Sequence, residues 1–353
     1  MPSPLSSSSI IEEVQASRNS SEEVQNPPEL WTLTRAPRPT IIASAGDLSL
    51  RDLRLMHHWS TFTWNTLTVG DEANRILLVT VPQLAFESEY LLYCILGISS
   101  HHLEHVDPTS RDNRASTAIY RVKALKAFRE VLARGDNPTL NWEAALMMSS
   151  LLLALCSMGT QKGEGDFTII SWLTLFRGLK ATMMIRGPEA LMMTSVSPVF
   201  RRILTELHIG PIIPKILLSL LQGVPELDPD FQYLESYYQA LNVLGSLYAS
   251  LAQDGLAPAL VMRVIAWPTY LTEDFVNCAK EKRPRALIIL AYFLVFFNLA
   301  EGLWWMDRMG DTDIKAIAET VGTEWLLYLS VPLEATTTRN AEEVARLLLR
   351  ELT

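Results

Sequence analysis

The run from Ala286 to Phe297 is uninterruptedly apolar. A helix that spans a bilayer needs about 20 such residues, so this shorter run predicts a helix buried in a protein core. Residues 141–158 are apolar nearly all round as well, which is typical of a helix with neighbours on every side. Two such segments in one chain require many further elements to cover them.

Helical spacing marks the covering elements. Leu55, Trp59 and Phe62 fall at i, i+4 and i+7, which predicts one face of a helix. Residues 91, 95 and 98 repeat that spacing with Leu, Ile and Ile. These intervals predict helices rather than strands.

A further helix is expected over residues 113–132. Its apolar positions form a stripe, opposite a basic side made of Arg121, Lys126 and Arg129, and Gly135 follows as a stop. The stripe consists of Ala118, Val122, Leu125, Phe128 and Leu132. Amphipathicity of this kind predicts that the stripe is buried and the basic side is solvated.

The C-terminal part predicts helices over 284–306, 313–329 and 341–352. No sustained period-two alternation and no regular repeat is present. The expected fold is therefore all-α, a single helical domain of about a dozen helices, although a short hairpin is compatible with the pattern.

The first 47 residues differ in composition from the rest. They are rich in Ser, Pro, Glu and Asn and have few large apolar side chains before Trp31, which predicts a disordered tail. Ser49 and Asp52 have the spacing of a capping box, so the helical domain is expected over residues 48–353. The N-terminus has no signal-peptide pattern.

Charge and cysteine content bear on partners. The formal net charge is −9, without the basic footprint of a DNA-binding domain, so no direct nucleic-acid contact is expected. The three cysteines, Cys94, Cys156 and Cys278, lie far apart in apolar stretches, which predicts buried thiols and no disulfide framework or structural zinc site.

One short motif matches a metal-dependent enzyme class. Residues 101–105, HHLEH, satisfy the H-x-x-E-H pattern, in which two histidines bind zinc and the glutamate activates water. Asp107-Pro108 ends the helix at once and no third ligand follows at a recognisable spacing, so a polar helix end is the favoured interpretation. No nucleophile elbow, P-loop or dinucleotide fingerprint occurs, and neither a metal nor a cofactor is expected.

Aromatic residues gather toward the C-terminus. Core packing explains them economically, but a pocket for a flat lipophilic ligand would use the same residue types, with indole N–H groups as polar contacts. The candidate ligand-binding residues are Tyr292, Phe296, Trp304, Trp305 and Trp325. The sequence leaves these two interpretations open.

Five segments in order resemble the C-terminal domain of the fungal sterol uptake control protein family of transcription factors. They are 53–67, 81–108, 119–132, 140–157 and 283–306, within a resemblance covering about residues 48 to 335. The resemblance implies a helical, ligand-binding and dimerising domain that follows a DNA-binding cluster of six cysteines. Residues 1–47 contain no cysteine, so a zinc cluster is expected to be lacking.

The function hypotheses follow from that combination. The first is a regulator in the nucleus or cytoplasm that senses a lipophilic small molecule, a sterol or secondary metabolite, or pairs with itself or with a zinc-cluster factor; an incomplete gene is a variant of it. The second is a metal-independent enzyme acting on a terpenoid-like substrate, with Asp307, Glu301, His58 and His102 as first catalytic candidates. A scaffold protein is the third.

Overall fold

The computed structural model describes residues 49–134, 140–157, 167–200, 210–300, 302–306 and 309–352, which fall within one compact unit, residues 41–353. Every regular element in these ranges is helical and none is a strand, which confirms the all-α prediction. The tail predicted over residues 1–47 and the stop predicted at Gly135 lie outside the described residues.

The N-terminal half combines long helices with short, tightly or loosely wound turns. In chain order it contains α2 (Leu50–His58), a π-helical turn (Trp59–Thr63), a 3-10 turn (Trp64–Thr66), α3 (Asp71–Arg75), a second π-helical turn (Ile76–Thr80), α4 (Val81–Phe86), α5 (Glu89–Val106), α6 (Arg111–Ala133), α7 (Trp142–Leu155), α8 (Thr168–Met184), α9 (Gly187–Met192) and α10 (Ser197–Phe200).

The C-terminal half continues with α11 (Lys215–Ser219), a 3-10 turn (Phe231–Tyr233), α12 (Leu234–Asp254), α13 (Pro258–Ala266), a 3-10 turn (Trp267–Tyr270), α14 (Glu273–Lys280), α15 (Pro284–Val295), a 3-10 turn (Phe296–Leu299), α16 (Met309–Val321), a 3-10 helix (Thr323–Leu329), α17 (Ser330–Ala335) and α18 (Ala341–Arg350).

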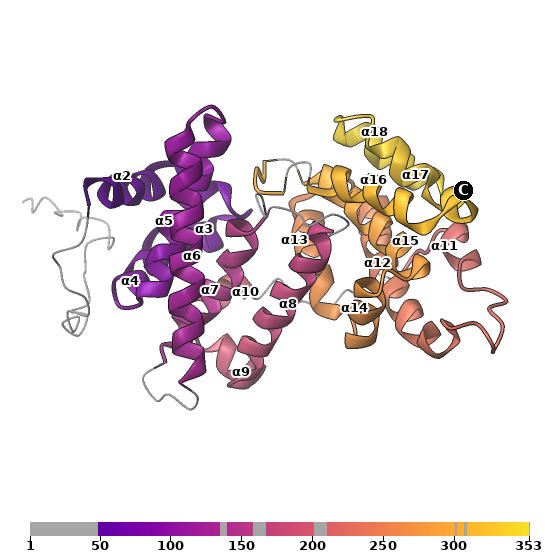
Figure 1. Ribbon diagram of the computed structural model, residues 1–353, viewed down its shortest axis with the longest axis horizontal. Helices are drawn as coiled ribbons and strands as arrows, with labels where there is room; N and C mark the ends of the chain where they lie inside the picture. Colours follow the sequence, from indigo (N-terminus) through magenta and orange to yellow (C-terminus); the bar gives the residue numbers. More distant parts are fainter. Residues whose placement is uncertain are drawn as a thin grey trace, which may run out of the picture. The chain divides into compact units, whose positions relative to one another are not determined.

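Helix α15 is the centre of the C-terminal half. Every residue from Ala286 to Val295 is buried, and the helix packs against α12, α14, α16 and α17 (Figure 1). Gly310 lets α16 approach closely, because a Cβ atom there would lie 2.7 Å from the carbonyl oxygen of Leu294. The apolar run from Ala286 to Phe297 is thus buried in the core, as predicted.

The N-terminal half is organised around α5, which packs against α2, α4, α6 and α7. α5 and α6 lie side by side along most of their length (Figure 1). The predicted apolar face of α5, at residues 91, 95 and 98, is fully buried, and α7 is buried nearly all round. These two predictions are confirmed.

Side-chain caps define several helix starts. The capping box predicted at Ser49 is present, since its hydroxyl accepts from the Asp52 amide and the Asp52 carboxylate accepts from the Ser49 amide. Ser110, Asn141 and Asn340 likewise accept from the third amide of α6, α7 and α18.

Two predicted helices end earlier than expected. The helix predicted over 284–306 stops at Val295, and the chain tightens into a 3-10 turn before Trp304 and Trp305 turn toward other elements. The helix predicted over 313–329 runs from Met309 to Val321 and ends at Gly322, whose φ of 89° breaks the α-helix.

The stripe predicted for α6 was wrong. Phe128 is buried, but Val122, Leu125 and Leu132 are exposed, and the buried face instead uses Thr117, Tyr120 and Ala124. Smaller and amphipathic side chains cover α5 because α6 lies close to it, so hydrophobicity alone selected the wrong face.

Phe62 is exposed as well, although Leu55 and Trp59 on the same predicted face are buried. The π-helical turn Trp59–Thr63 widens the helix after Trp59, and this change of period brings Thr63 inward in place of Phe62.

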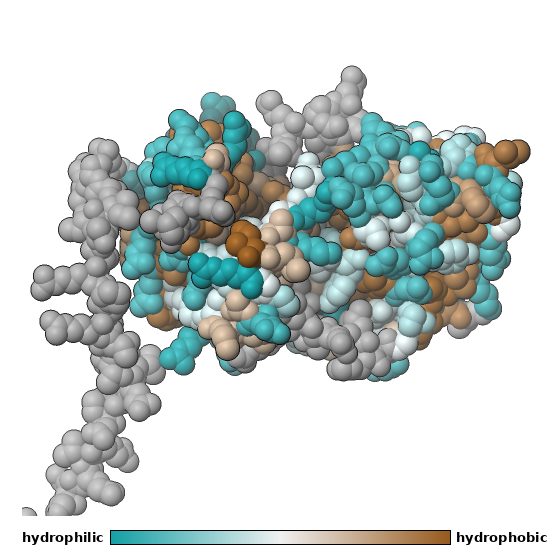
Figure 2. Space-filling view, turned by 90° about the horizontal axis from the view of Figure 1, so that it is seen from below, coloured by the Kyte–Doolittle hydropathy of each residue, from teal (hydrophilic) through white to brown (hydrophobic). Residues whose placement is uncertain are grey.

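Hydrophobic groups reach the surface among hydrophilic ones on the face shown in Figure 2. No helix in the described part of the chain is both long and apolar enough to cross a membrane.

Asp313 is a buried carboxylate that connects two distant helices. It lies on α16, is inaccessible to solvent, and accepts a 2.7 Å hydrogen bond from the amide of Ile169 in the first turn of α8. Free amides at a helix N-terminus favour an anionic acceptor, so Asp313 caps α8 from 144 residues away.

We expect Asp313→Ala to lower the free energy of unfolding by about 2 kcal/mol, because it leaves a buried amide without its acceptor. Asp313→Asn, which keeps an acceptor oxygen, should lose less. Glu319→Ala on the exposed side of the same helix is the control and should change stability by under about 0.5 kcal/mol in urea titrations. Equal losses in Asp313→Ala and the control would refute the cap.

Candidate functional site

Four histidines gather around one tryptophan where α2, α5 and the 302–306 segment meet. The ring centroids of His101, His102 and His105 lie 4.9, 5.1 and 5.4 Å from that of Trp304, and His102 is stacked on it. His58, at the end of α2, lies 5.1 Å from His102. We call these five residues the His–Trp cluster.

The π-helical turn after α2 positions one side of this cluster. Trp59 is fully buried and donates its indole N–H to the carbonyl of Leu77 at 3.0 Å, which anchors the turn. Thr63, brought inward by the turn, forms a 3.1 Å hydrogen bond with Nδ1 of His102. π-helical turns of this kind are frequent at functional sites.

Trp304 and Trp305 position the other side. Trp304 donates to the hydroxyl of Thr66 at 2.9 Å, and Trp305 donates to the carbonyl of Leu67 at 3.2 Å. These two bonds join residues 238 positions apart in the sequence. They hold the 302–306 segment against Thr66 and Leu67, at the end of the 3-10 turn Trp64–Thr66.

Burial keeps the central histidines neutral. Loss of hydration, together with the nearby Arg121 guanidinium, lowers the pKa of His101 to about 4. Burial and the neighbouring His58 lower the pKa of His102 to about 4, and burial also lowers the pKa of His58. At neutral pH each ring therefore offers one donor and one acceptor nitrogen.

Several of these nitrogens have no partner among the described residues. Both ring nitrogens of His101, which is only 2% exposed, and Nε2 of His58 are buried without a hydrogen bond. Buried polar atoms are nearly always satisfied in folded proteins, so these atoms mark a place where a further polar group fits.

A mostly apolar hollow of about 380 Å³ adjoins the cluster at His58. It is lined by Leu53, Arg54, His57, His58 and Leu103. Hollows that combine apolar walls with a few convergent polar atoms are typical of small-molecule sites.

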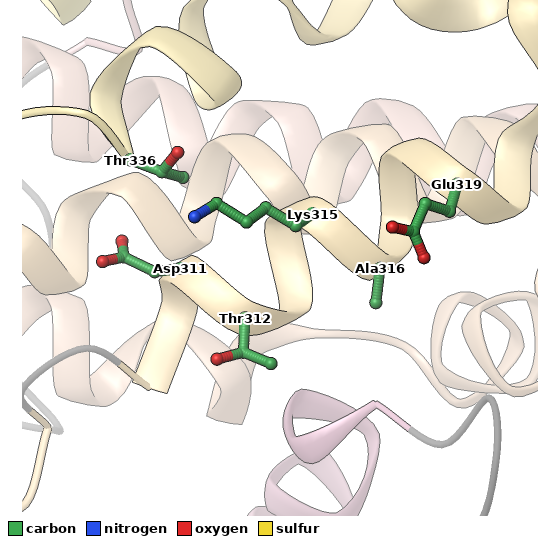
Figure 3. A pocket seen from close by; sticks show the side chains of 6 residues that line it. All are labelled: Asp311, Thr312, Lys315, Ala316, Glu319 and Thr336. Carbon is green, nitrogen blue, oxygen red and sulfur yellow. The ribbon is translucent and has the colours of Figure 1, made fainter.

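Two other surface hollows differ in chemistry. One of about 460 Å³ on α16 is polar (Figure 3). In it Lys315 extends toward Asp311 and Thr336, and Glu319 lies at the opposite end. Another of about 530 Å³ lies beside Trp142, whose ring is covered by the Arg186 guanidinium. Among the described residues that line them, neither contains a buried group without a hydrogen-bond partner.

The H-x-x-E-H motif does not form a metal site in the described residues. His101 points into the core, His105 is exposed, and Glu104 pairs with Arg114 at 3.1 Å. No group of three or more His, Cys, Asp or Glu side chains with metal-binding geometry occurs in the described ranges. The cysteines remain free thiols, of which Cys94 and Cys278 are buried.

The candidates named from the sequence separate into three groups. His58, His102 and Trp304 meet in the His–Trp cluster, and Trp305 lies directly beside it, packed on Trp172 at 5.9 Å. Asp307 and Glu301 lie outside the described residues.

The remaining ligand candidates lie elsewhere. Tyr292 and Phe296 are fully buried beside α12, where Phe296 packs edge-on against Tyr248. Trp325 is half-buried beneath the Arg285 guanidinium, 5.3 Å from its ring centroid. The five aromatic candidates are therefore distributed over the core rather than gathered around one hollow.

Sequence reasoning missed His101 and Thr63 as members of the site. The favoured interpretation of residues 101–105 as a polar helix end is wrong for His101 and His102, which are buried. Thr63 carries no chemical signal of its own. The adjacent pairs His101-His102 and Trp304-Trp305 were visible signals, but the contact between these distant parts of the chain was not.

Comparison with known proteins identifies relatives over most of the chain. The fungal specific transcription factor domain matches residues 54–255. A Zn(2)-C6 fungal-type transcription factor of Gibberella zeae is 24% identical over 84% of this chain and 64% of its own length. The Zn(2)-C6 fungal-type transcription factor afumD of Aspergillus fumigatus is 24% identical over 80% of this chain and 76% of its own length.

A shorter similarity joins the chain to Sterol uptake control protein 2 of Saccharomyces cerevisiae, which is 32% identical over 35% of this chain and 13% of its own length. The chain thus spans less than two thirds of the Gibberella relative and a small part of the yeast protein. The resemblance stated from the sequence is confirmed.

The neutral His101 predicts an acid-sensitive fold. Because its pKa is about 4 when folded and near 6.5 when unfolded, the unfolded chain alone takes up a proton between these values. Stability from this residue is fully present above pH 6.5 and is lost as the pH falls toward 4, by up to about 3 kcal/mol.

We expect His101→Phe to reduce but not abolish the fall in unfolding free energy between pH 6.5 and 4, because His102 has a similarly lowered pKa; urea titration at each pH measures this. Met184→Phe, at an exposed position on α8 outside the cluster, is the control and should keep the wild-type slope. Parallel pH curves for His101→Phe and the wild type would contradict the assignment.

Proposed function

The chain belongs to the fungal specific transcription factor domain family, and we propose that it is a regulatory domain that senses a lipophilic small molecule at the His–Trp cluster. The ligand class is a sterol or a secondary metabolite with an apolar body and a hydroxyl group. The protein acts in the nucleus or cytoplasm and influences transcription without contacting DNA through these residues.

One observation carries the proposal: His58, whose buried Nε2 has no hydrogen-bond partner among the described residues, lines an apolar hollow. Leu53 and Leu103 provide apolar walls beside His58. A neutral imidazole can accept a hydrogen bond from a hydroxyl group without the cost of a buried charge. The apolar body of the ligand would then contact the leucines.

Trp304 links this hollow to the rest of the domain. It contacts His101, His102 and His105 and is tied to Thr66, so a ligand that moves His58 or His102 also displaces the 302–306 segment. Trp305 extends the same path to Trp172 on α8. Through these contacts, ligand binding at the hollow would change the packing of α8.

Tyr292, Phe296 and Trp325 remain proposed as ligand contacts of a second kind. Tyr292 has a buried hydroxyl without a hydrogen-bond partner in the described residues, as does the nearby Tyr248. Because both are fully buried, a ligand reaches them only if α12 and α15 separate. The hollow beside His58 needs no such opening and is the preferred site.

The charged residues support action through a partner. The net charge is −9 and the three cysteines cannot provide the six thiolates of a zinc cluster. In the basic segment 280–285, Arg283 pairs with Asp230 at 2.8 Å and Arg285 pairs with Asp228 at 2.9 Å. These arginines support the fold, and we propose a second copy or a zinc-cluster factor as the partner.

The enzyme hypothesis receives less support. A general base works best when its pKa lies near the working pH, and His102, with a pKa of about 4, is too weak a base for neutral conditions. The two acidic catalytic candidates, Asp307 and Glu301, lie outside the described residues. Binding explains the neutral histidines better than proton transfer.

We expect the protein to bind ergosterol, which has one hydroxyl, more tightly than squalene, which has none. Leu103→Asp should weaken ergosterol binding at least about tenfold by placing a charge in the apolar wall, and His58→Phe should weaken it about tenfold by removing the hydrogen-bond partner. Quenching of tryptophan fluorescence and native mass spectrometry measure both effects.

Val106→Asp, on the exposed end of the same helix and outside the hollow, is the matched control and should bind normally. Equal affinity in Leu103→Asp and Val106→Asp would exclude the hollow as the site. Chemical conversion of the added ligand by the pure protein would overturn a purely regulatory role.

A further inference from the structure

Helix α6 is a positively charged element of a negatively charged chain. Within the helix, Arg111–Ala133, six side chains are basic and two are acidic, which gives it a net charge of +4, whereas the whole chain has a net charge of −9. The solvent side of the helix also carries large apolar side chains. We define the α6 outer face as its exposed residues Ile119, Val122, Leu125, Lys126, Arg129 and Leu132.

Apolar residues form a line along this face. Val122 is 65% exposed, Leu125 38% and Leu132 45%. Positions 122, 125, 129 and 132 alternate in steps of three and four, so their side chains lie on one side of the helix. The buried side is separate and contains Tyr120 and Ala124. A surface helix normally carries polar side chains opposite its buried face, so this apolar line fits the apolar stripe of a further helix.

The cations of α6 are arranged against the stability of the isolated helix. Lys123, Lys126 and Arg129 follow one another in steps of three, which places like charges on neighbouring turns, where they repel. Arg111 lies in the first turn, where the helix dipole disfavours a cation. Neither Lys126 nor Arg129 forms an ion pair within the described part of the chain. An anionic partner along this side would offset the repulsion.

We propose that the α6 outer face binds an amphipathic helix of another protein, whose apolar stripe is flanked by acidic side chains. The apolar stripe of that helix would contact Val122, Leu125 and Leu132, as amphipathic helices do when they dock through anchors three and four residues apart. Its carboxylates would pair with Lys126 and Arg129. Complementary charge of this kind steers the encounter and selects the partner.

Other occupants fit the α6 outer face less well. A nucleic-acid backbone would pair with the cations but leave the apolar line without a partner. Helices that lie in a membrane surface bury Trp, Phe and Leu side chains, whereas this face has no aromatic residue and Arg129 interrupts its apolar line. A second copy would bring two helices of the same positive charge together. The acidic amphipathic helix satisfies both the apolar and the charged residues.

This inference deepens the proposed function and rests on one part of it, namely that the chain acts through other proteins. It does not depend on ligand sensing, because the α6 outer face shares no residue with the His–Trp cluster or its hollow. Binding of an acidic helix and binding of ergosterol can therefore fail separately in experiments on the same protein.

A synthetic peptide of about 21 residues tests the inference. It carries leucines alternately three and four residues apart, glutamates on both flanks of that stripe and glutamine elsewhere. Fluorescence anisotropy of the labelled peptide, titrated with the full chain at low salt, should give a Kd of about 10 to 100 µM. Raising the salt to about 0.5 M should weaken binding at least about fivefold, because it screens the ion pairs. The same peptide with lysine in place of glutamate should not bind.

Single substitutions locate the binding surface. Val122→Asp and Arg129→Glu should each weaken binding of the glutamate peptide at least about tenfold, by disrupting the apolar line and reversing a charge. Leu327→Asp is the control for the first, since Leu327 is 75% exposed and lies outside α6. Arg339→Glu is the control for the second, because it is exposed and changes the net charge equally. Both controls should bind normally.

A charge exchange tests the role of the cations. The double variant Lys126→Glu with Arg129→Glu should lose the glutamate peptide and gain binding of the lysine peptide, because the apolar line is retained while its flanking charges are reversed. Circular dichroism of each variant verifies that α6 remains folded. Ergosterol binding by Val122→Asp should equal that of the wild type, which separates this surface from the sensing site.

Four results would overturn the inference. The first is a wild-type chain that binds neither peptide, or both equally, at about 100 µM. The second is peptide binding that Val122→Asp leaves unchanged. The third is a chain that binds vesicles containing phosphatidylserine and loses them in Val122→Asp, which would make the face a membrane contact. The fourth is sedimentation velocity showing that Val122→Asp separates two copies of the chain, which would assign the face to self-association.

Discussion

The burial of α15 on every side is the constraint on which the rest of the C-terminal half depends. A helix without a solvated face needs neighbours all round, and α12, α14, α16 and α17 fill these positions. Close approach of α16 requires Gly310, and the same helix carries Asp313, which caps α8. The segment 302–306 connects α15 to α16, so their packing also determines where Trp304 and Trp305 lie.

Buried tryptophans then join elements that are distant in the sequence. Buried indole N–H groups usually find an acceptor, and Trp59, Trp142, Trp172 and Trp305 each donate to a backbone carbonyl of another segment, whereas Nε1 of Trp267 has no partner among the described residues. The bond from Trp305 to Leu67 brings the 302–306 segment to the end of the 3-10 turn Trp64–Thr66. The His–Trp cluster is a product of these bonds, and burial lowers the pKa of His58, His101 and His102 within it.

Local signals predicted much of the helical framework. The capping box at Ser49, the buried face of α5 and the all-round burial of α7 followed from short-range spacing. Predictions from local spacing were wrong where tertiary contacts decide which face of a helix is buried. On α6 the apolar stripe predicted to be buried is exposed apart from Phe128, and after Trp59 a π-helical turn changes the helical period.

The sequence by itself determined the all-α class, the core position of the Ala286–Phe297 run and the family, because helical period and apolar content are local properties of the chain. It also indicated His58 and His102 as catalytic candidates and Trp304 as a ligand-binding candidate, without indicating that the three residues meet. Only the tertiary structure decided that they meet, that His101 joins them with unsatisfied nitrogens, and that α6 turns an apolar stripe to solvent. Those outcomes depend on hydrogen bonds and packing between residues up to 238 positions apart, which no local spacing encodes.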